Sequence, residues 1–393
     1  MQLYILNPAY EIIGYIDETE STLWNKKYND VGQCEVYTPC NDEMLSMLQK
    51  GNYIYRYDDD MFCKIETLEI TTNAEQGDYI IATANDVVKM LAGRYPLKRF
   101  THKGTVATYI YRLIDENIIN PTDATRKIAN FVFDISNFDE LTETIETTTT
   151  EDDLLQIILT TCKVQNYGFR LSYDKEVGQL VFRLKKGKNK ATRDSGEYVE
   201  FSPAYSNILS SHYKEDESNY KNVAVILYTN DNGKNVYTLA YNGEEEPQGE
   251  ERRELFINAT GTSREVTYAE LMAMYPNAID QSESNEFTLN GVTIAKYTVD
   301  TNGMNITLTD NAIIPMLQDD GRKALAERKR TQEFSGNIDI VDTYEYKTDY
   351  DLGDVVKVIN EYGIEAEARI TEIMESEDNN DGYMIEPKYE YQN

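Results

Sequence analysis

The chain has 393 residues, with 69 acidic against 38 basic side chains and a formal net charge of -31. This length allows roughly two to four domains, and the 40% of apolar residues is typical of a folded protein. A surface this negative repels phosphate backbones and anionic membranes over a Debye length of about 8 Å. We therefore expect no sequence-specific nucleic-acid binding.

Targeting and metal signals are absent from the sequence. The start, MQLYILNPAYEIIGYID, lacks the basic region and apolar run of a secretory signal, and no apolar stretch reaches the roughly 18 residues of a membrane span. We expect synthesis in a cytoplasm and no stable membrane insertion. The cysteines form no CxxC pair and only two histidines are present, so we predict no zinc site and reduced, mostly packed thiols. These residues are Cys34, Cys40, Cys63, Cys162, His102 and His212.

Short segments rich in β-branched and aromatic residues dominate the first 85 residues. Asn, Pro, Gly and Asp separate them, which is typical of short strands joined by turns. The pattern predicts a small antiparallel barrel or sandwich over residues 1–85. The expected strands include Leu3–Leu6, Ile12–Ile16, Cys34–Tyr37 and Tyr53–Tyr57.

The apolar period becomes helical after about residue 85. GTVATYIYRLIDENI has apolar residues at helical spacing, and TEDDLLQIILTTC predicts a second helix with Thr150 as its N-cap. A hairpin is expected from Tyr167 to Leu184, with its turn between Asp174 and Gly178. We predict an inserted α+β domain over residues 86–197.

The β pattern returns from residue 198, with a hairpin turn at Asp231-Asn232-Gly233. A capping box starting at Thr267, a hairpin around Asn302-Gly303 and the charged helix DDGRKALAERKR follow. We predict a second insertion over 259–333, which splits a second barrel into residues 198–258 and 334–393. The expected fold is mainly β with α+β insertions: two related small antiparallel β-barrels and two inserted domains.

Residues 50–81 align with residues 352–385 as an internal repeat. Each copy reads as a strand, a polar turn, a strand, an acidic turn and a third strand. Duplication of a barrel half is one explanation, and a chance likeness between two β-meanders is the other. Two similar barrels in one chain would let a trimer present six similar units in a ring. The predicted structural turn residues, matched between copies, are Gly51 with Gly353, Asn52 with Asp354, and Gly77 with Gly382.

No catalytic, cofactor-binding or metal-binding residue is predicted. Asp58-Asp59-Asp60 is interpreted as a hairpin tip. The acidic stretch starting at Glu377 resembles a calcium loop, but Lys388 stands at the position of the bidentate Glu. The sequence contains neither GxSxG, GxGxxG nor GxxxxGK. The basic run from Lys185 to Lys190 fits a solvated loop or a contact with carboxylates of a neighbouring subunit.

Several stretches occur in an order that resembles a known family. They are LNPAYEIIGYIDETESTLWNKKYNDVGQCEVYTP, LQKGNYIYR, ANDVVKMLAGR, FSPAYSNILSSHYKEDESNYKNVAVI, GRKALAERKRTQEFSGNID and YEYKTDYDLGDVVKVINEYGIEAEARITEIMES. Together they resemble the tail hub of long-tailed phages of Gram-positive bacteria. This hub is the structural part of tail-associated (Tal-like) proteins and is related to the baseplate hub of contractile tails. The likeness is weakest over residues 259–318.

The resemblance implies a structural protein of the virion, at the distal end of the phage tail. It implies a homotrimer with pseudo-six-fold symmetry that joins a distal tail or tail tube protein to a tip, fibre or receptor-binding protein. DNA would pass through its bore, which a tape-measure protein could also occupy, and inward-facing carboxylates would repel the DNA. No cofactor is implied. Because the sequence stops at Asn393, just after the last predicted strands, we expect no cell-wall-cleaving region. The alternatives are a virion-associated cell-wall hydrolase that uses acidic residues, and a host-carbohydrate-binding tip module.

Overall fold

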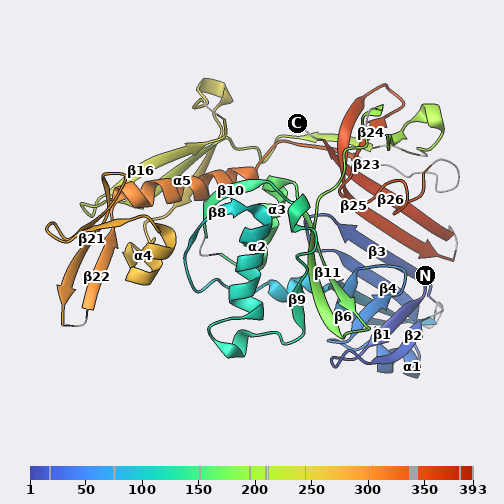
Figure 1. Ribbon diagram of the computed structural model, residues 1–393. Helices are drawn as coiled ribbons and strands as arrows, with labels where there is room; N and C mark the ends of the chain where they lie inside the picture. The colour runs from blue at the N-terminus through green and yellow to red at the C-terminus, as the bar shows by residue number, and fades with distance from the viewer. Residues whose placement is uncertain are drawn as a thin grey trace.

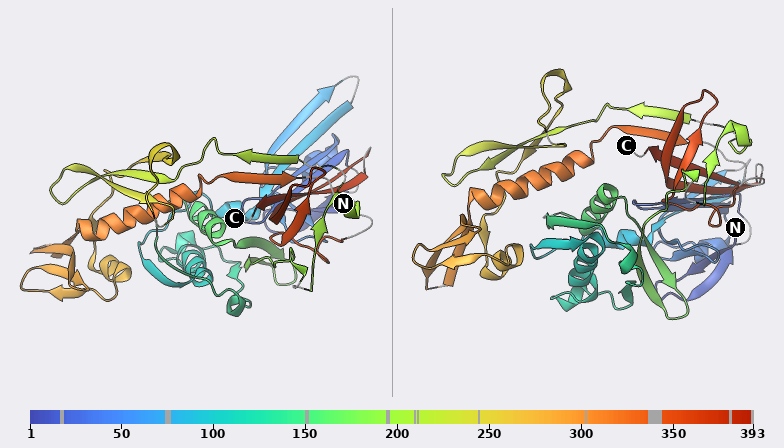
Figure 2. Two further views of the ribbon diagram at one scale, coloured as in Figure 1. Left: turned by 90° about the horizontal axis from the view of Figure 1, so that it is seen from above. Right: turned by 45° about the horizontal axis from the view of Figure 1, so that its top comes forward.

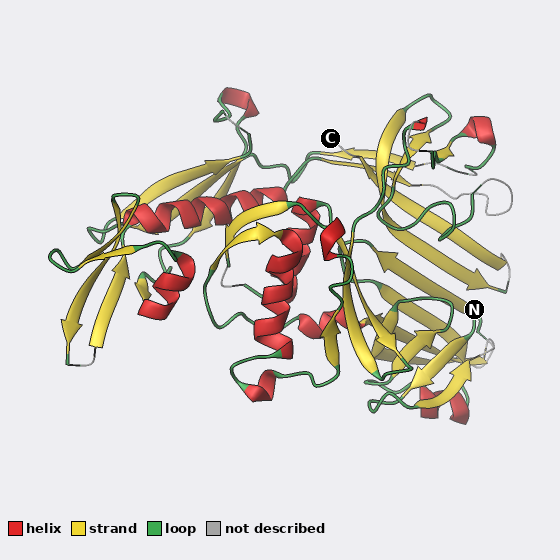
Figure 3. Ribbon diagram, viewed as in Figure 1, coloured by secondary structure: helices red, strands yellow, loops and turns green. Residues whose placement is uncertain are grey.

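A computed structural model describes most of the chain. The described residues are 1–16, 19–73, 77–149, 152–193, 196–208, 210, 212–243, 245–301, 303–335, 344–379 and 382–391. Strands dominate, and the longer helices lie in two bodies inserted between parts of one large sheet (Figure 3). The mainly β class is therefore confirmed.

A 13-stranded sheet unites the two ends of the chain (Figure 1). Its path is β14-β23-β26-β25-β3-β4-β7-β6-β5-β1-β2, and β24 and β13 branch from β25. The first-half elements are β1 (Leu3–Leu6), β2 (Ile12–Ile16), β3 (Ser21–Lys27), β4 (Gln33–Pro39), α1 (Asp42–Met47), β5 (Tyr53–Arg56), β6 (Phe62–Asn73) and β7 (Gly77–Asp86). The second-half strands are β13 (Glu200–Phe201), β14 (His212–Asp216), β23 (Thr331–Ser335), β24 (Val355–Ile359), β25 (Glu365–Asp378) and β26 (Gly382–Tyr391).

The alternation of side chains along these strands gives most of the sheet one covered and one open face. Next to β1, β5 and the start of β6 the second face is covered too, because Leu6, Tyr53 and Phe62 join the core of the first inserted body. On β4, for example, Cys34, Val36 and Thr38 are buried while their neighbours are exposed or half-buried. Buried residues of each half form a core of their own on the covered face. Among the described residues the ladders follow an open path, with β2 and β14 as its terminal strands. Closure into two barrels therefore stays a prediction.

The first inserted body follows β7 and has an α+β composition, with a core of its own. Asp153, directly before the apolar run, caps α3 and accepts hydrogen bonds from the backbone N–H groups of Leu155 and Gln156. The predicted cap, Thr150, lies outside the described residues, and the cap prediction was wrong. The elements are β8 (Thr101–Thr105), α2 (Val106–Ile114) with a π turn (Asp115–Ile119), β9 (Phe131–Phe133), β10 (Thr144–Thr148), α3 (Leu154–Gln165), β11 (Gly168–Asp174) and β12 (Gln179–Lys185), with 3-10 turns at Val87–Leu91, Ala124–Arg126 and Phe138–Glu140.

The second inserted body lies between β14 and β23, far from the large sheet in Figure 2. Its two sheets pack on α5 (Asp310–Ala326), α4 (Tyr268–Met274) and each other. The strands are β15 (Val223–Thr229), β16 (Asn235–Tyr241), β17 (Glu254–Asn258), β18 (Glu265–Val266), β19 (Ile279–Gln281), β20 (Glu286–Leu289), β21 (Val292–Asp300) and β22 (Gly303–Leu308), with 3-10 turns at Pro203–Tyr205 before β14 and Gly249–Glu251 before β17. The predicted capping box at Thr267 is present. The hairpin expected around Asn302-Gly303 joins β21 to β22, although Asn302 itself is not described.

The grouping of β15, β16 and β17 differs from the sequence-based expectation. The prediction assigned these strands to the second barrel. Among the residues that the structure describes, however, they pair only with one another and pack against α5. Small side chains permit this contact: a Cβ on Gly321 of α5 would lie 3.0 Å from the Ala240 Cβ and 2.8 Å from the Ile226 Cδ1. The alternating pattern of such strands identifies a covered face but not the element that covers it.

None of the helices in the described part of the chain is long and apolar enough to cross a membrane.

Candidate functional site

Two three-stranded units repeat at the two ends of the chain: β5-β6-β7 and β24-β25-β26. Both are antiparallel meanders with matching register. The pair Cys63 with Asp86 in the first unit corresponds to Ala368 with Tyr391 in the second. At the far end, Asn73 pairs with Gly77 as Asp378 pairs with Gly382. The two units therefore correspond strand by strand and residue by residue.

The turn before each unit is built in the same way. The N–H of Gly51 donates to the Ile65 carbonyl at 2.9 Å, and the N–H of Gly353 donates to the Ile370 carbonyl at 2.8 Å. In return, Ile65 donates to the Asn52 carbonyl at 2.8 Å, and Ile370 to the Asp354 carbonyl at 2.9 Å. A β-bulge directly follows both isoleucines. A shared irregularity of this kind is a stronger sign of a repeat than a shared strand order, because bulges interrupt the regular ladder.

The paired turns differ in their surroundings. Asn52 donates through its side-chain amide to the Met47 carbonyl, at the end of α1, at 2.8 Å. Asp354 instead accepts from the backbone N–H of Lys188 at 2.8 Å and lies 3.1 Å from the Lys190 ammonium. Gly77 and Gly382 both open the third strand of their unit with positive φ angles, 91° and 74°.

The basic run binds carboxylates of its own chain. Lys185 pairs with Asp351 at 2.6 Å, Lys186 with Glu143, and Lys188 with Glu197 at 3.2 Å. The predicted solvated loop fits these lysines, whose side chains are 40%, 37% and 69% exposed. The contact with carboxylates of a neighbouring subunit stays a prediction. The pairs with Asp351 and Glu143 were not predicted, because these acids are distant in sequence.

The two halves of the sheet meet where β3 pairs with β25. This junction is antiparallel and extends from Ser21 opposite Asp378 to Lys27 opposite Glu372. On its covered face lie Trp24 and Lys26 of β3 and Glu375 of β25, all at most 1% exposed. It is the one place in the described main sheet where a strand of the first half pairs with a strand of the second half.

A buried ion cluster fastens this junction. The Lys26 ammonium contacts Glu375 and lies 2.6 Å from the Asp59 carboxylate. The Arg56 guanidinium binds Glu375 at 2.7 Å. Lys347 reaches the same Asp59 oxygen at 3.0 Å. The cluster thus links β3, β5 and the turn after it to β25 and to the segment before β24.

Burial and ion pairing shift the pKa values of Asp59 and Glu375 in opposite directions. Burial alone would raise the pKa of Asp59, but Lys26 and Lys347 hold that pKa well below its ordinary value. Burial would likewise raise the pKa of Glu375, and Lys26 and Arg56 lower it. Both carboxylates are therefore ionised at neutral pH, and removing one cation would leave a buried, uncompensated charge.

Sequence reasoning missed this cluster. Asp58-Asp59-Asp60 does form the turn between β5 and β6, but the Asp59 side chain is fully buried. A usable signal was present: Lys26 and Glu375 occupy inward positions in the alternation of their strands. A lysine and a glutamate at such positions on two strands indicate a buried pair between them.

Features that could support catalysis are sparse among the residues that the structure describes. They contain no group of three or more His, Cys, Asp or Glu placed to hold a metal ion. The four cysteines are free, and burial raises the pKa of the Cys162 thiol. His102 contacts the Thr105 carbonyl at 3.1 Å, while His212 lies on β14. A cleft of about 730 Å³ between α3 and α5 contains Asp320, whose side chain is 48% exposed. Partial desolvation in this cleft raises the pKa of Asp320 above its ordinary value.

The comparisons with known proteins identify the family. A family model described as the siphovirus ReqiPepy6 Gp37-like protein matches residues 2–388. The chain belongs to this Gp37-like family. The predicted resemblance to proteins of long-tailed phages is thereby confirmed. None of the curated proteins compared with this Gp37-like chain matches it.

Solved structures show which fold the Gp37-like chain shares. A tail protein from Neisseria meningitidis MC58 aligns with a TM-score of 0.51 and 12% identity, over 99% of this chain and 96% of that one. The prophage tail protein gp18 from Listeria monocytogenes EGD-e gives 0.47 and 12%, over 100% and 95%. The 43 kDa tail protein of prophage MuSo2 from Shewanella oneidensis gives 0.48 and 11%, over 99% and 98%. The first alignment shows a common fold.

Proposed function

We propose that this chain is the structural hub of a phage tail, a homotrimer whose six repeated units form a ring around a bore. The observation that carries the proposal is the duplication: two units with the same turn, bulge and register in one chain. A chain with two similar units gives six positions from three copies. Such a ring has exact three-fold symmetry, because its three chains are identical. Its backbone is close to six-fold symmetric, because the two units of each chain are similar.

The internal junction supports this arrangement. The β3-β25 ladder already joins one unit to the next within the chain, so the same kind of contact, repeated between chains, extends the sheet. Oligomers that repeat one heterologous contact close into rings when the rotation permits.

The open face of the sheet is the surface proposed to line a bore. The first inserted body covers this face only beside β1, β5 and the start of β6, where Leu6, Tyr53 and Phe62 join the core of that body. Elsewhere the side chains of the open face are mostly exposed or half-buried, and acids outnumber bases. The acids are Glu35, Glu69, Asp216, Glu365, Glu367, Glu372, Asp378, Glu386 and Glu390, and the exposed or half-buried bases are Lys27, Lys64, Lys214, Lys357 and Lys388. This excess favours a weakly repulsive bore, through which DNA slides without binding. It is a smaller bias than the net charge of -31 alone suggests.

In the virion we place the ring at the distal end of the tail. There it would connect a distal tail or tail tube protein to a tip, fibre or receptor-binding protein, with the end of a tape-measure protein as a possible occupant of the bore. Family membership and the shared fold with a tail protein support this placement.

The oligomeric mass of the full chain tests the proposal. Native mass spectrometry or sedimentation is expected to give three times the chain mass of 45.2 kDa, in the purified protein or in hubs released from tails. A different subunit number in released hubs would contradict it.

One observation favours a second candidate, a cell-wall hydrolase. The raised pKa of Asp320 in the cleft between α3 and α5 is a property of general acids in glycoside hydrolysis. Zymography on host cell walls distinguishes the two functions. Under the hub proposal, the full chain and the Asp320→Asn variant both leave the walls intact. Lysis by the full chain that the variant lacks would establish the hydrolase instead.

A further inference from the structure

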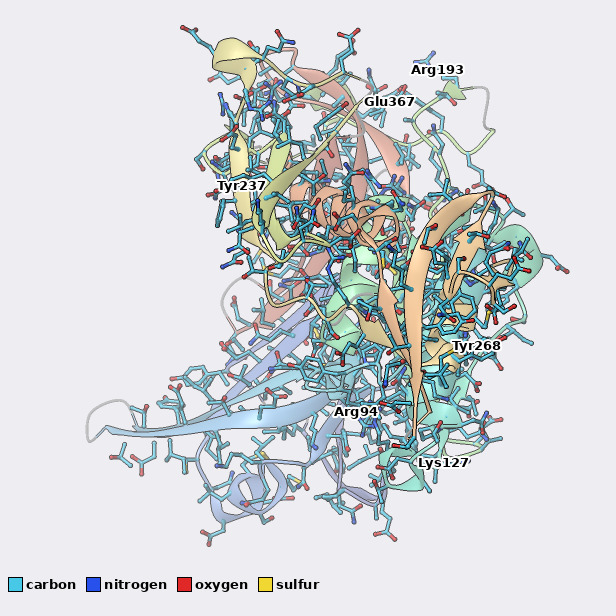
Figure 4. All side chains as sticks on the ribbon, turned by 90° about the vertical axis from the view of Figure 1, so that its left-hand side faces the viewer. Arg94, Lys127, Arg193, Tyr237, Tyr268 and Glu367 are labelled. Carbon is cyan, nitrogen blue, oxygen red and sulfur yellow. The ribbon has the colours of Figure 1, made fainter. Side chains whose placement is uncertain are left out.

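The β6-β7 hairpin carries a long unpaired sheet edge. Figure 4 shows this hairpin projecting from the body of the molecule. Beyond Lys64, β6 pairs with β7 on one side and, among the described residues, has no strand on its other side. In the second unit, the equivalent edge of β25 is occupied by β3. An uncovered edge of this length is a template for pairing with another strand.

The sheet also contains a second copy of β3. In the first half, β3 pairs with β4, which pairs with β7. In the second half, β14 pairs with β23, which pairs with β26. Since β7 corresponds to β26, β14 is the counterpart of β3. It is also a terminal strand of the described sheet, with β23 on one side.

In the described part of the chain, β14 does not pair with the outer edge of β6. The two are separated in the sheet path by six strands: β23, β26, β25, β3, β4 and β7. Both edges are therefore available for a contact between copies. We propose that β14 of one copy pairs antiparallel with the outer edge of β6 of the next copy, reproducing the internal β3-β25 junction. This inference rests on the proposed ring and specifies the contact that closes it.

The internal junction fixes the register of the proposed one. In the internal junction, Asn25 lies opposite Met374 and Trp24 opposite Glu375. Asn25 and Trp24 correspond to Lys214 and Tyr213, by their places opposite β4 and β23. Met374 and Glu375 correspond to Glu69 and Ile70, by their places opposite β26 and β7. The predicted pairs between copies are therefore Lys214 with Glu69 and Tyr213 with Ile70.

The side chains fit this register. On the open face, Lys214 and Glu69 bring opposite charges together across the strands, a favourable pair. On the covered face, Ile70 is 51% exposed in the single chain although it occupies the position of Glu375, which is 1% exposed. Placing Tyr213 opposite Ile70 would cover this isoleucine. An aromatic side chain opposite a β-branched one is a stabilising cross-strand pair.

The proposed β14-β6 junction differs from the internal β3-β25 junction at the positions of the buried ion cluster. Arg56 on β5 corresponds to Val358 on β24, because Tyr53 pairs with Lys64 as Val355 pairs with Arg369. Where the internal junction buries Glu375 against Arg56, the proposed junction brings together Ile70 and Val358. Both members of the Arg56–Glu375 pair are exchanged for apolar residues. Lys26, the third charged residue, corresponds to Glu215, which accepts hydrogen bonds from Tyr213 and Gln332 of its own chain. This difference in side chains favours pairing of β3 with β25 and of β14 with β6. It disfavours the exchanged pairings of β3 with β6 and of β14 with β25.

Disulfide cross-linking of the full chain tests the register. The variant Ile70→Cys/Tyr213→Cys, mildly oxidised, is expected to give covalent dimers and trimers and nothing larger on non-reducing gels. The control Ile70→Cys/Glu215→Cys has both thiols on the same face but two residues out of register, a separation of about 7–8 Å between their backbones that disfavours a disulfide. The two single-cysteine variants exclude cross-links through the native thiols.

A charge exchange tests the same contact without new thiols. Glu69→Lys or Lys214→Glu alone is expected to weaken trimer association about fivefold, and the double exchange to restore most of it. If released hubs are trimers but the control cross-links instead, or the double exchange gives no recovery, the pairing is wrong while the hub proposal stands. If the chain forms no trimer even in tails, both fail.

Discussion

Gly51 and Gly353 occupy the same position in the two repeated units but have different neighbours. Their φ angles are 94° and 98°, a region that side-chain-bearing residues rarely adopt. A Cβ on Gly51 would have no atom within 4 Å, whereas a Cβ on Gly353 would lie 2.1 Å from the Tyr28 ring. The first glycine is required by its backbone alone, and the second by its backbone and by packing.

Alanine substitutions separate these two requirements. Gly51→Ala is expected to cost about 1–2 kcal/mol of unfolding free energy, from backbone strain. Gly353→Ala is expected to cost about 2 kcal/mol more, because the fully packed Tyr28 ring must move. Chemical denaturation of the two variants measures the difference. Equal losses would show that the contact with Tyr28 is not important.

Lys26 is the residue on which the buried cluster most depends, since it contacts both Asp59 and Glu375. Lys26→Met keeps the length of the side chain but removes the charge, and is expected to cost about 3–5 kcal/mol of unfolding free energy. The matched control is Lys388→Met. Lys388 is half-exposed and pairs with Glu372 at 2.8 Å, so its loss is expected to cost less than about 1 kcal/mol. Similar losses in the two variants would contradict the assigned role.

At the level of elements, the β3-β25 junction depends on pH through Asp59 and Glu375. Both have pKa values below their ordinary values in the folded chain. Their contribution to stability is therefore complete above the pKa values of the unfolded chain, about 4, and is lost as the pH falls through the lowered values.

Acid titration of unfolding tests this dependence. The junction contribution is expected to be constant between about pH 7 and pH 5 and to fall below about pH 4. Lys26→Met should show a weaker fall, because the two pKa values are less depressed without the lysine. Subtracting the two curves removes the effect of the many surface carboxylates. Parallel curves for the parent chain and the variant would contradict the assignment.

Much of this element structure was predictable from local sequence. Strands at Leu3–Leu6 and Tyr53–Arg56, the hairpin from β11 to β12 and the capping box at Thr267 follow from alternation, turn residues and cap chemistry. The packing of β15, β16 and β17 on α5 did not, because local pattern carries no information about the covering element. The same limit hid the ion cluster, in which Arg56 pairs with Glu375, 319 residues further along the chain.

At the level of the whole molecule, the chain is a large sheet with two inserted bodies. Figure 1 shows β16 and α4 of the second body on the opposite side of the molecule from β25 and β26 of the sheet. The proposed contact between copies uses two strand edges that no described strand occupies. One is β14, at one end of the sheet path, and the other is the outer edge of β6, near the other end. The repeat suggested this assembly from sequence, while the strands that would join copies required the topology.

A reconstruction of the tail tip by electron cryomicroscopy, without imposed symmetry, tests the central claim most directly. It is expected to show one ring of six similar β units from three chains, alternating between β3-β25 contacts within chains and β14-β6 contacts between chains. The open face of the sheet should line the bore. A hub with another number of chains, or with the covered face toward the bore, would contradict the account.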